Sequence, residues 1–209
     1  MAGEWLQQRD PKRPILALAP MQEVTHLAFM TVLHHYGDPD VYFTEYFRVH
    51  PHSHPSARIL RSITENPTGR PVMAQMIGSD PDRLVWTAKE LVQYPVAGID
   101  LNLGCPAPGV CSKDSGGGLL RDAARVDVIL GRLREALAEH CFTVKTRLGF
   151  HSPDEFSRLI EVFSRHGIDA LSVHGRTVKE KYQTPVHYDA IRLAVEGLSC
   201  PVLANGNVV

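Results

Sequence analysis

The stretch FTVKTRLGFHSPDEFSRLIEVFSRHGIDALSVHGRT, residues 142–177, contains one complete strand–helix–strand unit. Its two ends, FTVKTRLG (142–149) and ALSVHGRT (170–177), are apolar runs too short for a helix, and each leads into a polar loop. Between them, Ser152, Pro153 and Glu155 form a capping-box pattern, and apolar residues with helical spacing follow until Gly167. Two strands joined by such a helix lie parallel in one sheet, so this stretch predicts an α/β fold.

The same unit recurs along the chain. Short apolar runs begin at residues 14, 41, 71, 98, 142, 170 and 201, and a second capped helix is predicted over residues 79–94. Seven runs that alternate with helical segments favour a TIM (β/α)8-type barrel over the alternative, a doubly wound sheet. Because the next strand is due about thirty residues after Pro201, we expect a barrel truncated after its seventh strand. The expected organisation is an N-terminal extension over residues 1–13 and an incomplete catalytic barrel over residues 14–209.

Composition excludes several classes of protein. The 209 residues include 22 Lys+Arg and 23 Asp+Glu, a formal net charge of −1, which gives no sequence-wide basic signal for nucleic acid. No run approaches the roughly 20 apolar residues that cross a bilayer, and the N-terminus lacks a secretory pattern, so a cytoplasmic protein without membrane contact is expected. The four cysteines are too sparse for a disulfide framework and contain no CxxC zinc pair.

Polar side chains follow most of the predicted strands, and in a barrel these strand ends meet on the active face. The strand ends carry Pro20, Met21, Glu45, Gln75, Asn102, Cys105, Lys145, Arg147, His174, Arg176, Asn205 and Asn207. This set has donors and acceptors for a polar heterocycle, but no carboxylate pair for glycoside hydrolysis and no Ser/His/Asp constellation. His50, His52 and His54 are interpreted as a solvated loop in preference to a metal site, and no metal is expected.

Three features each have a structural and a functional interpretation. Lys145 is either a side chain that reaches solvent or a cation that stabilises negative charge on a bound ring. Cys105 is either a small buried apolar residue or a catalytic nucleophile or acid on a long loop. Residues 116–118, three consecutive glycines, form either a loop that closes over a substrate or a tight turn into the next helix.

Taken together, the motifs resemble those of the tRNA-dihydrouridine synthase family, flavin-dependent barrels that reduce uridine in tRNA. The matching motifs occur in the family's order and near its spacing: LAPM (18–21), TEY (44–46), AQMIG (74–78), DLNLGCP (100–106), VKTRLG (144–149), VHGRT (173–177) and ANGNV (204–208). The resemblance extends from about Pro14 to the last residue. The combination of NLGCP, the lysine of VKTRLG and VHGRT separates this family from other flavin barrels.

The resemblance implies an oxidoreductase that binds FMN, takes hydride from NADPH and reduces the C5=C6 bond of a D-loop uridine in tRNA. It implies that Cys105 donates a proton to the uracil, after the base has flipped out of the tRNA. The residues implied in FMN binding are Pro20, Met21, Gln22, Gln75, Lys145, His174, Asn205, Gly206 and Asn207. The residues implied in substrate contact are Asn102, Arg147 and Arg176.

The chain departs from the family pattern at MQEVTH (21–26) and at Val110–Cys111, which affects the expected choice of substrate. The resemblance also implies an eighth strand with a phosphate-binding loop and a helical tRNA-binding domain, neither of which we identify in this sequence. A monomer is expected for the full-length protein. Two alternatives stay open: another flavin barrel that reduces a small pyrimidine or enone, and an inactive remnant of such an enzyme.

Overall fold

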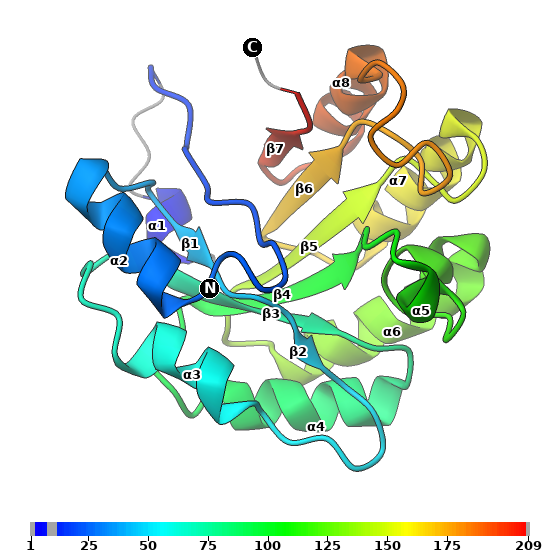
Figure 1. Cartoon of the computed structure of the whole chain (residues 1–209). Helices are drawn as coiled ribbons and strands as arrows, with labels where there is room; N and C mark the ends of the chain where they lie inside the picture. Colours follow the sequence, from blue (N-terminus) through cyan, green and yellow to red (C-terminus); the bar gives the residue numbers. More distant parts are fainter. Residues whose placement is uncertain (1–2, 8–11, 208–209) are drawn as a thin grey trace.

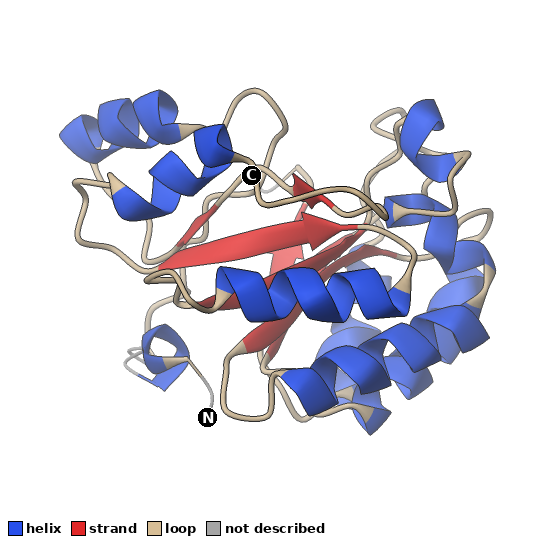
Figure 2. Cartoon of the chain, turned by 90° about the horizontal axis from the view of Figure 1, so that it is seen from below, coloured by secondary structure: helices blue, strands red, loops and turns tan. Residues whose placement is uncertain are grey.

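The computed structural model describes residues 3–7 and 12–207; residues 1–2, 8–11 and 208–209, which include parts of the expected N-terminal extension and the end of the expected barrel, lie outside the described residues. The chain folds around one parallel sheet whose outer face is covered by helices (Figures 1 and 2). This arrangement confirms the predicted TIM-type α/β architecture through its seventh strand.

The sheet has the strand order β1-β3-β4-β5-β6-β7, with β2 also paired to β3, and every pairing is parallel. The strands are β1 (Tyr42–Phe43), β2 (Phe47–Arg48), β3 (Val72–Ile77), β4 (Gly98–Leu103), β5 (Phe142–Arg147), β6 (Ala170–His174) and β7 (Val202–Asn205). Both faces of β3 and β4 are buried, as expected for strands that have helices on one side and the barrel interior on the other. Six of the seven predicted strands begin within one residue of their predicted positions.

The helices follow the strands in alternation and pack against one another around the sheet. They are α1 (Glu4–Gln7), α2 (Leu27–Tyr36), α3 (Ala57–Thr64), α4 (Pro81–Leu91), α5 (Pro108–Cys111), α6 (Ala123–Ala136), α7 (Phe156–Arg165) and α8 (Tyr188–Gly197), with 3-10 turns η1 (Gly116–Arg121) and η2 (Pro153–Glu155). The predicted capping box before α7 is present, although its first turn is the 3-10 turn η2. Asp80 caps α4, whose buried face includes Leu84, Ala88 and Leu91.

The first two predicted strands differ from the expectation. The segment after Pro14 forms a single parallel bridge, Ala17 with Val41, instead of a full strand. The second strand is divided into β1 and β2. Phe43 pairs with Met73 and Phe47 pairs with Met76, so four steps along one strand oppose three along the other. One extra residue is therefore accommodated as a bulge, which changes the direction of the side chains between the two pieces.

Among the described residues, the sheet is open between the Ala17 segment and β7, and Figure 1 shows the two sides of this opening facing each other. The short helix α1 contributes Trp5 and Leu6 to a small apolar cluster with Phe43 and Cys141. Over the described part of the chain, the structure contains no helix with the length and apolar character needed to span a membrane.

Candidate active site

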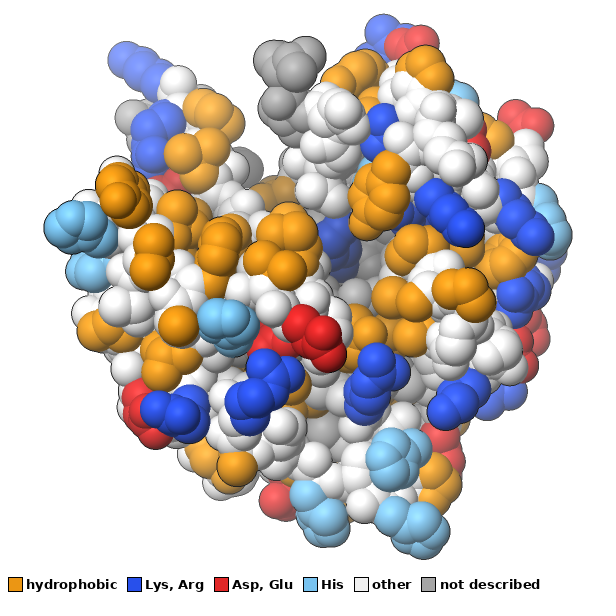
Figure 3. Space-filling view, viewed as in Figure 1, with side chains coloured by type: hydrophobic (Ala, Val, Ile, Leu, Met, Phe, Trp, Pro, Cys, Tyr) orange, Lys and Arg blue, Asp and Glu red, His pale blue; other side chains and the backbone are white. Residues whose placement is uncertain are grey.

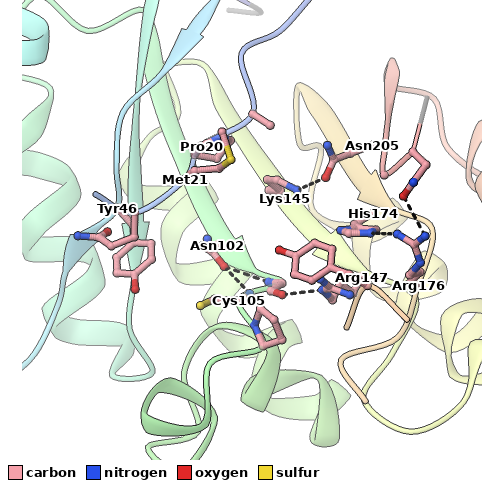
Figure 4. A pocket seen from close by; sticks show the side chains of 17 residues that line it. Pro20, Met21, Tyr46, Asn102, Cys105, Lys145, Arg147, His174, Arg176 and Asn205 are labelled. Carbon is pink, nitrogen blue, oxygen red and sulfur yellow. Dashed lines mark hydrogen bonds between the residues drawn. The ribbon is translucent and has the colours of Figure 1, made fainter. Parts of the chain in front are cut away.

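A cavity of about 350 Å³ opens at the carboxyl ends of the strands. In the space-filling view it appears as a hollow near the centre of the face, with a Lys or Arg side chain visible inside it (Figure 3). Its lining residues are Ala19, Pro20, Met21, Gln22, Tyr46, Asn102, Gly104, Cys105, Pro106, Lys145, Arg147, His174, Arg176, Tyr182, Asn205, Gly206 and Asn207. Figure 4 shows Tyr46 on one side of the cavity, Lys145 and His174 on the other, and Asn102 between them.

The structure brings almost all of the candidate site residues together. Of the predicted cofactor and substrate residues, only Gln75 does not line this cavity; it is fully buried beneath it. Glu45, expected at a strand end, is also buried and instead binds Arg58 through two hydrogen bonds of 2.8 and 3.1 Å. It also accepts a bond from the backbone N–H of Glu23, so Glu45 anchors the loop that carries Met21 and Gln22. The ligand roles assigned to these residues stay predictions.

Lys145 is held at the end of β5 by a hydrogen bond from its Nζ to Asn205 Oδ1, 2.8 Å away. Burial lowers the pKa of Lys145 to about 8; Asp100 opposes this shift and Arg147 adds to it. A lysine with a depressed pKa in a cavity stabilises a bound ligand that carries or develops negative charge. Lys145 is partly exposed, and it lines the cavity.

His174 lies at the end of β6 beside Arg176. Burial, together with the nearby cations Arg147, Lys145 and Arg176, lowers the pKa of His174 to about 3, so the ring is neutral at pH 7. Arg176 Nη1 lies 3.1 Å from His174 Nε2. Because a guanidinium can only donate, Nε2 accepts and the ring proton is on Nδ1. The same arginine donates from Nη2 to Asn207 Oδ1, 2.9 Å away, and so connects β6 to the loop after β7.

Cys105 is partly exposed in the cavity on the loop that follows β4. Asn102 Oδ1 accepts hydrogen bonds from the backbone N–H groups of Gly104 and Cys105, both at 3.0 Å. The carbonyl of Cys105 accepts a bond from Gly117 N at 3.1 Å. A Cβ atom on Gly117 would lie 2.9 Å from that carbonyl oxygen, so the residue is glycine because the backbones approach closely. This packing favours the tight-turn interpretation of the glycines over a mobile cover.

Arg147 is buried, and its guanidinium joins two loops. Nε donates to Gly104 O at 2.9 Å, and Nη1 donates to the carbonyls of Thr177 and Lys181 at 2.9 and 2.8 Å. The side chain therefore connects the cysteine loop to the loop after β6, and only part of its hydrogen-bonding capacity faces the cavity.

Two aromatic residues of the cavity were not selected from the sequence. Tyr46 comes from the bulged segment between β1 and β2, where alternation along a regular strand does not predict the side-chain direction. Burial raises the pKa of Tyr46, and so does Cys105 beside it. Tyr182 lies in an irregular loop, and its ring packs near His174 and under the Arg147 guanidinium. The motif TEY was the only available signal for Tyr46, and the sequence gives no signal for Tyr182.

The histidine loop lies outside the cavity. His50, His52 and His54 are exposed, and His54 packs against the ring of Trp86. Within residues 3–7 and 12–207, no group of three His, Cys, Asp or Glu side chains is arranged to hold a metal ion.

The cavity suits a planar, polar and anionic ligand. Lys145, Arg147 and Arg176 are cations, and among the described residues no Asp or Glu lines the cavity. Gln22 Oε1 is buried and has no hydrogen-bond donor among the described residues, so it is a ready acceptor for a ligand N–H. Pro20 and Met21 supply apolar surface on the same side. Apolar surface with a few convergent polar groups is typical of a cofactor site, and these residues fit FMN.

Fold and site together define an α/β-barrel domain with a ligand site at the carboxyl ends of its strands. A variant of NCR from Zymomonas mobilis has a similar fold, with a TM-score of 0.58 and 10% sequence identity over 93% of this chain and 75% of that one. The chain belongs to the dihydrouridine synthase family, because that family's model matches residues 17–209. The match confirms the family that the ordered motifs indicated.

Two curated relatives have similar sequences over nearly the whole chain. The tRNA-dihydrouridine(16) synthase of Neisseria meningitidis serogroup A is 34% identical over 210 residues, which cover 97% of this chain and 63% of the relative. The protein of the same name from Neisseria meningitidis serogroup B is 33% identical, with the same coverage. The chain therefore spans about three-fifths of the length of these relatives.

Proposed function

We propose that this chain forms the catalytic barrel of a tRNA-dihydrouridine synthase, which adds two hydrogens across the C5=C6 bond of a uridine in tRNA. The observation that carries the proposal is the position of Cys105 in the same cavity as Lys145 and His174, three side chains contributed by different strand ends. Membership of the dihydrouridine synthase family supports it, as do the names of the relatives.

FMN is the cofactor that we assign to this cavity. When bound and reduced by NADPH, it supplies the hydride for C6 of the uracil ring. Pro20 and Met21 would pack against its ring, Gln22 would accept a hydrogen bond and Lys145 would donate one to an electron-rich edge. His174, Arg176 and the Asn205–Asn207 segment supply donors for the remaining polar groups. Gln75 reaches this set only through its neighbours, because it does not line the cavity.

Cys105 supplies the second hydrogen. Hydride addition at C6 leaves an electron pair at C5, and a neutral product requires a proton there. The S–H bond of Cys105 breaks as the C5–H bond forms, and solvent then reprotonates the thiolate. The neighbouring Tyr46, whose pKa is raised, keeps its phenolic proton and can donate a hydrogen bond in this region.

The substrate base has to leave its stack to reach this cavity, because the cysteine lines a concave site and not a flat surface. Asn102, Arg147 and Arg176 are the proposed contacts to the flipped base or its phosphate. Their cationic and amide groups match the oxygen acceptors of uracil and of the RNA backbone.

The test has a cofactor stage and a product stage. The purified chain should bind FMN and show flavin absorbance, and with NADPH and tRNA lacking dihydrouridine it should form dihydrouridine. Cys105→Ala should lower product formation by about 10²–10⁴-fold while leaving flavin reduction by NADPH unchanged. Cys200→Ala is the matched control, because this thiol lies outside the cavity. Failure to bind added FMN, or full product formation by Cys105→Ala, would contradict the proposal.

A further inference from the structure

Asp100 is a fully buried acid on β4 that the proposed reaction does not use. It lies in register with Gln75 on β3 and Thr143 on β5, below the level of Asn102 and Lys145. Burial raises the pKa of Asp100 to about 6, and the hydrogen bonds from Thr143 and Gln75 oppose that shift. Burial of a carboxyl group in a barrel interior costs free energy unless hydrogen bonds compensate for the lost water. The hydrogen-bonding partners of Asp100 therefore indicate its role.

Asp100 begins a continuous chain of hydrogen bonds. Its Oδ1 accepts from Thr143 Oγ1 at 2.6 Å, and its Oδ2 accepts from Gln75 Nε2 at 2.7 Å. Gln75 Oε1 then accepts from Asn102 Nδ2 at 2.8 Å. Asn102 Oδ1 in turn accepts hydrogen bonds from the backbone N–H groups of Gly104 and Cys105. The chain thus connects the barrel interior to the backbone of the cysteine.

The direction of this chain follows from the chemistry of its two ends. A carboxylate only accepts, so Gln75 must present its NH₂ group to Asp100 and its oxygen to Asn102. Asn102 must then present its NH₂ group to Gln75 and its oxygen to the backbone N–H groups. Reversal of either amide would place two donors or two acceptors against each other in a buried site, which is strongly unfavourable.

We propose that Asp100 is a positioning residue for Cys105: acting through Gln75, it holds Asn102 in the orientation that fixes the cysteine loop. The functional consequence rests on the proposed role of Cys105 as proton donor. The positioning itself is a property of the ligand-free protein. The experiments use the chain without FMN or tRNA, so they decide the positioning independently of the proposed activity.

The first experiment measures amide hydrogen exchange at Gly104 and Cys105 by NMR. Asp100→Leu should accelerate exchange at both amides at least tenfold relative to the unaltered chain, with little change at Leu101 on the same strand. Asp100→Asn should restore slow exchange, because an Asn oxygen can accept from Gln75 while its NH₂ group donates to Thr143 Oγ1. Unchanged exchange at Gly104 and Cys105 in a folded Asp100→Leu chain would overturn the proposal.

The second experiment tests transmission through Gln75 with isosteric variants, which also decides the matter if Asp100→Leu does not fold. Asn102→Asp places Gln75 between two carboxylates, and one of them has no donor from Gln75. Adding Asp100→Asn lets Gln75 reverse, so that every group is paired again. We expect the unfolding equilibrium constants of this cycle to depart from additivity by at least tenfold. Gln93→Glu, an amide-to-acid change on an exposed residue, should be additive with Asp100→Asn.

Simple repulsion between two buried acids would also give coupling, and a Gln75→Met background separates the two causes. Repulsion persists without Gln75, whereas coupling through its amide disappears. In the double variant, NOEs from the Gln75 Nε2 protons should move from residue 100 to residue 102. Additive effects, coupling that survives in Gln75→Met, or unchanged NOEs would each overturn the proposal.

Discussion

Replacement of Lys145 by methionine should stabilise the ligand-free chain at neutral pH. The pKa of Lys145 falls from 10.5 to about 8 on folding, which corresponds to a cost of about 3 kcal/mol for keeping the ammonium charged at pH 7. An uncharged thioether side chain at this position would not carry this cost, but Asn205 Oδ1 would lose its donor, a loss of about 1 kcal/mol. The expected net gain in the free energy of unfolding is about 2 kcal/mol.

The pH dependence of the stability difference shows whether the charge of Lys145 is its cause. Because the folded pKa is depressed, the folded chain binds fewer protons than the unfolded chain between pH 8 and 10.5, so the stability of the unaltered chain rises with pH over that range. At pH 10 the cost of the charge has fallen to about 1 kcal/mol, and the advantage of Lys145→Met should be close to zero. Urea unfolding followed by circular dichroism at pH 7 and pH 10 measures both values.

The exposed Lys113 provides the control, since Lys113→Met should change stability by less than about 0.5 kcal/mol. A Lys145→Met chain that is less stable at pH 7, or that keeps its advantage at pH 10, would refute the reasoning. If the proposed cofactor site is correct, the same variant should weaken FMN binding about ten- to a hundredfold, because it loses a charged donor. Fluorescence titration with FMN measures that loss.

Two further predictions concern the loops around the cavity. Gly117→Ala should lower the free energy of unfolding in urea by about 1–3 kcal/mol, because its Cβ would lie 2.6 Å from Val178 Cγ2. Gly109→Ala, which has open space around its Cβ, should be nearly neutral. Equal effects of the two variants would contradict this prediction. Partial burial raises the pKa of Glu180, but bonds from Thr177 and His187 lower it to about 2 overall. Glu180→Gln should therefore lower Tm above pH 4.5, and its deficit should shrink as the pH falls through 4.5 towards 2; a deficit independent of pH would exclude the carboxylate as its cause.

The regular part of the fold could be predicted because its signals are local. β3 to β7 are apolar runs of ordinary strand length, and the Ser152 capping box lies directly before α7. The Ala17 segment was less predictable because it pairs by one bridge, and Pro14 and Pro20 at its ends have no N–H to donate. The bulge between β1 and β2 depends on register with β3, a non-local property that the hydrophobic pattern does not contain.

The site residues likewise divide into positions that the local sequence predicts and contacts that it does not. Strand-end positions could be read from the sequence, so Cys105, Lys145 and His174 were found without a structure. What each polar group binds could not be found, because it depends on residues distant in the chain. Glu45 anchors a loop through Arg58, and Arg147 joins two loops through backbone carbonyls. Position alone would assign Glu45 to the ligand, although it does not line the cavity, and it would not show that Arg147 also joins two loops.

The positive charge of the cavity affects both the stability of the ligand-free fold and the kind of ligand that the cavity can bind. Lys145, Arg147 and Arg176 lie together, and no carboxylate from the part of the chain that the structure describes lines the cavity with them. Their combined field contributes to keeping His174 neutral. Asp100 offsets part of that field from below, but it is buried and its hydrogen-bond partners, Thr143 and Gln75, are neutral. An anionic ligand would complete the balance from the open side and raise the pKa of Lys145 towards its usual value. The charge of Lys145 destabilises the ligand-free fold, so its presence in the cavity is itself an argument for an anionic ligand.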